Sequence, residues 1–144
     1  MIISNRLVLF LVALFVVFAV SADWSAARLG LHAATGGAVL LLTFGAFALG
    51  WMGGGDAKLI AATALWFGPT LALWDYLFFA SLLGGVLTLT ILLARACLRP
   101  TTGNPSVDRL LDPASGVPYG VALGAAGILV ALRLPEMQSV LGLI

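Results

Sequence analysis

The stretch Tyr76-Leu-Phe-Phe-Ala-Ser-Leu-Leu-Gly-Gly-Val-Leu-Thr-Leu-Thr-Ile-Leu-Leu-Ala94 contains no charged side chain. Its length is close to the about 20 apolar residues that an α-helix needs to cross a bilayer of about 30 Å. Similar stretches occur at Leu7–Ala22, Ala33–Met52, Ala57–Trp74 and Val117–Leu132. The sequence therefore predicts an all-α, polytopic membrane bundle of about five transmembrane helices, with boundaries good to about 2–4 residues. We expect a single membrane domain over residues 1–144.

The composition supports this class. A chain of 144 residues with 62% hydrophobic residues, 9% charged residues and a mean hydropathy of +1.14 cannot bury its apolar surface in a soluble core. The net charge is +1 without a basic cluster, so nothing indicates nucleic acid. Cys97 is the single cysteine, which excludes an internal disulfide and a cysteine-rich zinc site. We expect the lipid bilayer as a partner, and no nucleic acid, metal or cofactor.

Basic residues in the short connections predict the orientation, because cytoplasmic connections carry more Lys and Arg. With the N-terminus in the cytoplasm, Arg28 and Arg133 lie outside and most of the others inside, namely Arg6, Lys58, Arg95, Arg99 and Arg109. The segment 96–116 is polar and rich in proline, and we interpret it as a cytoplasmic loop with room for one helical turn.

The run Gly53-Gly54-Gly55-Asp56-Ala57-Lys58 places a carboxylate and an ammonium group inside this apolar chain. A charge at the centre of a transmembrane helix costs about 2.5–3.5 kcal/mol on insertion scales, so Asp56 is a functional candidate. The three glycines let a ligand backbone approach closely. Lys58 has three possible roles: a contact with a lipid phosphate, support for the Asp56 carboxylate, or a cytoplasmic anchor whose side chain reaches the interface.

Aromatic residues and a histidine lie near the predicted ends of the spans. Trp51, Trp66, Trp74 and Tyr76 are at positions typical of the aromatic belt at a membrane interface. His32 precedes the second predicted span and has no clustered partner that would favour metal binding, so we expect it to be interfacial and solvated.

Small residues are spaced as helix packing in membranes requires. Gly36-Gly37, Gly84-Gly85 and the pair Gly120 and Gly124 predict close contacts between helices.

Two motifs resemble the type IV prepilin peptidases, which are membrane aspartic proteases with a GxGD motif. Phe47-Ala-Leu-Gly-Trp-Met-Gly-Gly-Gly-Asp-Ala-Lys-Leu59, followed by Leu65-Trp-Phe-Gly-Pro69, is similar to their second catalytic motif. Gly116-Val-Pro-Tyr-Gly120 is similar to the motif that opens their last span, particularly in the short branch associated with Tad/Flp pili. The resemblance implies an endopeptidase of the bacterial inner membrane, with prepilin as its substrate and Asp56 as a catalytic residue. Nothing in the chain corresponds to the cysteine-rich domain of the longer relatives, so we expect no methyltransferase activity and no zinc.

Aspartic proteases need two carboxylates that share a proton within a few ångströms. Asp23 is a poor partner for Asp56, because one predicted span separates the two and places them on opposite faces of the bilayer. Asp108 and Asp112 are on the correct side but lie in the polar loop, where we expect them to be solvated.

The beginning of the chain suggests where the second carboxylate belongs. Ile3-Ser4-Asn5 matches the element that follows the first catalytic aspartate in the family. We therefore expect this sequence to start just after that aspartate and to lack the family's first transmembrane helix. Either the initiation codon lies further upstream or the chain is a truncated, inactive relative. The reading frame before Met1 would show an apolar stretch that ends in Asp in the first case.

Two other classes of function remain open. Asp56 and Lys58 are intramembrane charges of the kind found in ion paths, which allows a small transporter or channel subunit, although the chain shows no internal repeat. The missing second carboxylate favours a non-catalytic pilus-assembly protein built on the peptidase fold.

Overall fold

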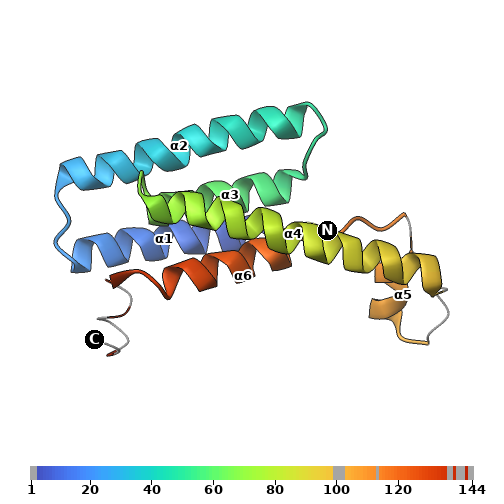
Figure 1. Cartoon of the computed structure of the whole chain (residues 1–144). Helices are drawn as coiled ribbons and strands as arrows, with labels where there is room; N and C mark the ends of the chain where they lie inside the picture. The colour runs from blue at the N-terminus through green and yellow to red at the C-terminus, as the bar shows by residue number, and fades with distance from the viewer. Residues whose placement is uncertain (1–2, 99–102, 113, 136–137, 139–141, 143–144) are drawn as a thin grey trace.

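The computed structural model describes residues 3–98, 103–112, 114–135, 138 and 142. Over these residues the regular secondary structure is all α-helix, without a strand. This confirms the predicted fold class. Figure 1 shows the helices, which are α1 (Asn5–Ser21), α2 (Ala26–Ala48), α3 (Gly54–Phe67), α4 (Leu71–Cys97), α5 (Pro105–Leu111) and α6 (Tyr119–Ala131).

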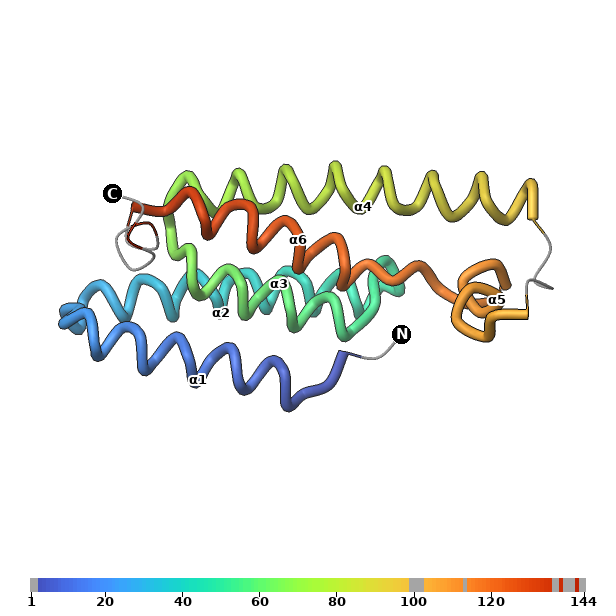
Figure 2. Tube along the Cα trace, turned by 90° about the horizontal axis from the view of Figure 1, so that it is seen from below, coloured from blue at the N-terminus to red at the C-terminus, as the bar shows by residue number. Residues whose placement is uncertain are grey.

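The five longer helices lie side by side as a bundle, with α3 at its centre (Figures 1 and 2). Helix α3 contacts α1, α2, α4 and α6, and α4 packs along α6. The chain runs back and forth between two ends of this bundle. The starts of α1, α3 and α6 lie at one end with α5, and the α1–α2 and α3–α4 turns lie at the other (Figure 1). The predicted inside residues Arg6, Lys58, Arg95 and Arg109 therefore gather at one end, whereas Arg99 lies outside the described residues.

Local signals in the sequence explain where these helices begin. The side chains of Ser4 and Ser25 accept hydrogen bonds from the backbone at the starts of α1 and α2. Asn104 does the same for α5, whose first residue is Pro105. Because Ser25 provides this cap, α2 begins at Ala26, well before the Ala33 that hydropathy predicted.

The predicted boundary between the third and fourth spans is wrong. Helix α3 ends at Phe67, because Gly68 adopts a φ of 58° and Pro69 follows it. Helix α4 then begins at Leu71, so Asp75 lies inside α4 and not between two spans. Hydropathy missed the turn because apolar residues flank it on both sides. The predicted loop 96–116 contains one short helix, α5.

Two of the described helices have the length and composition of transmembrane helices. Within the described residues, α2 and α4 are long and apolar enough to cross a bilayer, and α1 and α6 are shorter apolar helices. On α2, Leu41 and Leu42 are each 75% exposed, as expected of side chains that face lipid.

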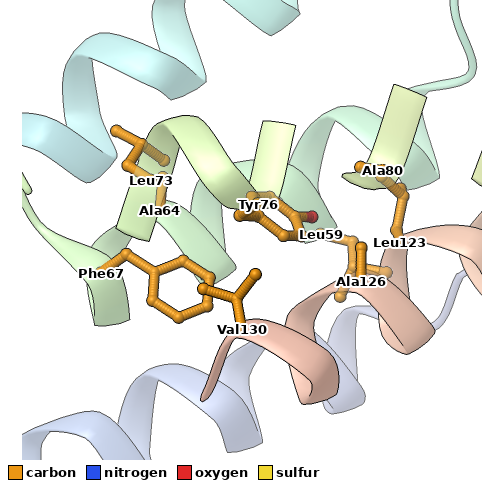
Figure 3. Packing of buried hydrophobic residues seen from close by; sticks show 9 residues of the cluster. All are labelled: Leu59, Ala64, Phe67, Leu73, Tyr76, Ala80, Leu123, Ala126 and Val130. Carbon is orange, nitrogen blue, oxygen red and sulfur yellow. The ribbon is translucent and has the colours of Figure 1, made fainter. Parts of the chain in front are cut away.

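The core of the bundle lies between α3, α4 and α6 (Figure 3). Ala64 of α3 and Ala126 of α6 are completely buried, which lets these helices approach closely. Tyr76 of α4 is also completely buried, so its predicted place in an interfacial belt is wrong. The cluster consists of Leu59, Ala64, Phe67, Leu73, Tyr76, Ala80, Leu123, Ala126 and Val130.

A second buried group surrounds His32 at the opposite end of the bundle from Asp56. His32 is only 5% exposed, and its ring lies 5.9 Å from Phe15 and 4.7 Å from Trp24. Its Nδ1 is 2.9 Å from the carbonyl oxygen of Leu65, so Nδ1 carries the proton and donates. The prediction of a solvated His32 is therefore wrong, because α2 begins before this residue and turns it toward α3.

Trp66 also bonds within the protein, because its indole Nε1 donates to the carbonyl oxygen of Leu11 at 3.1 Å. Trp51 and Trp74 are exposed, at 78% and 70%.

Candidate active site

Asp56 lies in the first turn of α3, at the end of the bundle where α1 and α6 begin. The free backbone N–H groups and the dipole of a helix N-terminus favour a carboxylate at this position. The Asp56 side chain is half-buried and lines a cavity of about 900 Å³.

The three glycines before Asp56 lie against neighbouring groups. A Cβ atom at Gly53 would lie 3.2 Å from Oδ2 of Asp56, and one at Gly54 would lie 3.1 Å from the Phe47 ring. A Cβ atom at Gly55 would lie 3.0 Å from the backbone nitrogen of Ile3. Such contacts are tighter than most Cβ atoms make, so the glycines allow three different groups to approach the first turn of α3.

The cavity brings together segments that are far apart in the sequence. Its walls come from the N-terminal segment, the start of α3, the middle of α4 and the segment that leads into α6. Most of the lining side chains are apolar, and Asp56 is the one lining residue with a carboxylate among the described residues. The lining consists of Ile3, Leu7, Trp51, Met52, Gly53, Asp56, Leu59, Ile60, Leu77, Ala80, Ser81, Gly116, Val117, Pro118, Tyr119, Gly120, Val121 and Leu123.

The Val117-Pro118-Tyr119-Gly120 motif forms one wall of this cavity. The Tyr119 hydroxyl is 3.2 Å from Oγ1 of Thr88, which donates to it. The Tyr119 ring lies over Gly84, where a Cβ atom would come within 2.6 Å of it. The two motifs on which the sequence resemblance rests therefore meet at one cavity.

Lys58 binds the start of α1. Its Nζ atom donates a hydrogen bond of 2.6 Å to Oδ1 of Asn5. This bond is a role that the sequence analysis did not consider, a link between α3 and α1. Among the described residues, Lys58 makes no ion pair with Asp56.

The other carboxylates among the described residues do not line the cavity. Asp23 is in the α1–α2 turn at the far end of α2, a helix of 23 residues or about 35 Å. Asp108 and Asp112 belong to α5 and its C-terminal end, and neither lines the cavity. The Oδ1 atom of Asp112 accepts a hydrogen bond from the backbone of Ala114 at 2.9 Å. The described residues contain no group of three His, Cys, Asp or Glu side chains that could hold a metal ion.

Sequence reasoning missed how α4 contributes to the site. Gly84 was interpreted as a packing residue and Thr88 was not singled out, yet both contact Tyr119. The available signal was their spacing of four residues, which places them on one face of α4.

The model of the type IV leader peptidase family matches residues 1–93, a range that contains Asp56 and its three glycines. No curated protein and no solved structure matches the chain.

Proposed function

This chain belongs to the type IV leader peptidase family, and from that premise we propose that it is an aspartic endopeptidase that removes the leader peptide of Flp-type prepilins. Asp56 is one of its two catalytic carboxylates. The observation that carries the proposal is the placement of Asp56 in the first turn of α3, on a largely apolar cavity that also includes the Val117–Gly120 motif.

The chemistry assigned to Asp56 follows from what aspartic proteases do. One carboxylate takes a proton from the attacking water, while the other, kept neutral by its neighbour's charge, donates a hydrogen bond to the scissile carbonyl. Gly53 lines the cavity and has only the Asp56 carboxylate within 4 Å of its Cβ position, so it leaves space for a peptide backbone there, whereas Phe47 and Ile3 fill the space at Gly54 and Gly55. The partner carboxylate is not among the residues that line the cavity in the described part of the chain.

The substrate and the membrane orientation are part of the same proposal. A cavity lined by side chains such as Leu7, Ile60 and Leu77 suits the apolar segment that follows a prepilin leader. Arg6, Lys58, Arg95 and Arg109 gather at the cavity end of the bundle, and the positive-inside rule assigns that end to the cytoplasm. The protein is then a multi-pass protein of the bacterial inner membrane that cleaves at the cytoplasmic face.

A second candidate function rests on Asp56 as the one carboxylate that lines the cavity in the part of the chain that the structure describes. Without a partner, Asp56 cannot form a proton-sharing pair, which favours a non-catalytic pilus-assembly protein on the same fold. Such a protein binds pilin-like helices without cutting them.

The deciding experiment measures leader removal from a Flp-type prepilin in cells, by immunoblot and by mass spectrometry of the new N-terminus. The gene is expressed from its own reading frame, so that any residues translated before Met1 are included. Asp56→Asn is expected to reduce processing by at least about 100-fold, and the matched variant Asp23→Asn to leave it unchanged. Normal processing by Asp56→Asn, with pilus assembly still dependent on the gene, would establish the assembly function instead.

A further inference from the structure

Arg95, near the end of α4, makes two hydrogen bonds to the chain that connects α4 with α6. Its Nε atom donates to the carbonyl oxygen of Leu110 at 2.9 Å, and its Nη2 atom donates to that of Ser115 at 2.6 Å. Both bonds are partly buried. The planar guanidinium group carries several donors in a fixed geometry, so one side chain can hold two carbonyl groups at once.

The second of these carbonyl groups directly precedes the cavity wall. Ser115 is followed by Gly116, with which the lining by residues 116–121 begins. Residues 116–118 are not helical, and α6 starts after Pro118, which provides no side-chain cap. The carbonyl oxygens of Val117 and Pro118 accept hydrogen bonds from the backbone of Tyr119 and Val121, at the start of α6. The position of the segment relative to α4 therefore depends on bonds to other elements.

A second attachment lies further along α4. Tyr119 packs on Gly84, and its hydroxyl accepts a hydrogen bond from Thr88. In an α-helix, residues four and eleven positions apart lie within about 40° of each other around the axis. Gly84, Thr88 and Arg95 therefore lie on one face of α4, the face along which α5 and α6 pack. Figure 2 shows α5 beside the end of α4 and the connection from α5 to α6 running back along it.

We propose that Arg95 is a positioning residue of the active site, which holds the Gly116–Val121 wall of the cavity through Ser115. The wall is attached to α4 on both sides of Pro118, by Arg95 before it and by the Tyr119 contacts after it. Loss of Arg95 releases the first attachment, so the wall moves relative to Asp56. The expected effect of Arg95 on activity rests on the proposed peptidase function, whereas the attachment of the wall rests on the hydrogen bonds of Arg95 alone.

The test combines hydrogen exchange in detergent-purified protein with prepilin processing in cells. In Arg95→Ala, amide exchange in peptides covering residues 114–121 is expected to rise about tenfold, since bonds to a charged donor are lost, while exchange in α2 and α3 stays unchanged. Processing is expected to fall about tenfold. Arg95→Lys keeps the charge but has a single nitrogen donor in place of the planar guanidinium, so both losses should be smaller than in Arg95→Ala but not absent. Arg109→Ala, which removes the same charge from α5, is the matched control and should change neither.

Each outcome has a distinct meaning. Unchanged exchange over residues 114–121 in Arg95→Ala would overturn the attachment. Increased exchange with wild-type processing would overturn the positioning role, provided that Asp56→Asn abolishes processing in the same assay. Processing that survives Asp56→Asn would instead reject the proposed function and leave the exchange result to decide on the attachment alone. Equal losses in Arg95→Lys and Arg95→Ala, or a loss in Arg109→Ala, would also contradict the proposal.

Discussion

The backbone nitrogen of Ile3 lies directly against Gly55, and a Cβ atom at position 55 would be only 3.0 Å from it. The side chain of Ile3 extends to Gly120 of α6, and a Cβ atom at position 120 would lie 3.1 Å from the Cδ1 atom of Ile3. One apolar residue therefore occupies the space between two glycines from different helices, next to Asp56. This arrangement holds the N-terminal segment at the cavity.

The contact between Ile3 and Gly55 predicts the effect of a branched side chain at position 55. Gly55→Val is expected to displace the N-terminal segment and reduce prepilin processing by about tenfold or more, because a small misplacement of reacting groups costs much of the rate. The control is Gly45→Val in α2, where a Cβ atom would meet nothing within 4 Å. Equal processing by the two variants would contradict the prediction.

The turn between α3 and α4 predicts a loss of stability. Gly68 has a φ of 58°, and a Cβ atom there would come within 2.5 Å of the His32 ring. Gly68→Ala is therefore expected to lower the free energy of unfolding by about 1–3 kcal/mol from backbone strain alone. Thermal unfolding in detergent measures this. Gly85→Ala in α4 has open space around it and should be at least as stable as the wild type, and a Gly68→Ala variant of equal stability would show that the turn can relax.

The buried hydroxyl of Tyr76 predicts an unusual result for its removal. This oxygen makes no hydrogen bond of normal geometry among the described residues, although the side chain is completely buried. Leaving such a group unpaired costs about 1–3 kcal/mol. Tyr76→Phe is therefore expected to unfold at the same or a higher temperature than the wild type, whereas Tyr76→Ala should lose about 3–5 kcal/mol through the cavity that it creates.

The comparison variant for this prediction is Tyr119→Phe, whose hydroxyl has a partner in Thr88 and whose loss should be mildly destabilising. A clear loss of stability in Tyr76→Phe would show instead that the hydroxyl is bonded, for example to a water. Figure 3 shows the hydroxyl on the side of the cluster where Leu59, Ala80 and Leu123 lie, and all three line the cavity.

The bond between Lys58 and Asn5 predicts a small, measurable coupling. A double-mutant cycle of unfolding free energies with Lys58→Met and Asn5→Ala is expected to give a coupling energy of about 0.5–1 kcal/mol between the two side chains, since the bond is charge-assisted but exposed to solvent. A coupling near zero would leave Lys58 as a residue that affects only the membrane orientation.

The sequence predicted the helical class and the residues of the two motifs, but several helix ends, and the burial of Tyr76 and His32, differ in the structure. Windows of hydropathy cannot detect a turn such as Gly68–Thr70, because the residues on both sides are apolar. The same limit applies to Tyr76 and His32, which were assigned to the interface. Whether a polar ring faces lipid headgroups or another helix depends on the rotation of its helix, and hydropathy carries no information about that rotation.

Residue types alone predict that the chain forms apolar helices and that Asp56 follows a run of three glycines, because composition and local backbone preferences depend on nothing else. Helix packing was needed to bring the Val117–Gly120 motif, Ile3 and Asp56 to one cavity, and to bond Arg95 and Lys58 to other segments. No local pattern predicts these contacts, because they join residues far apart in the chain. They depend on how α3 packs against α1, α4 and α6, which small residues such as Ala64 and Ala126 make possible.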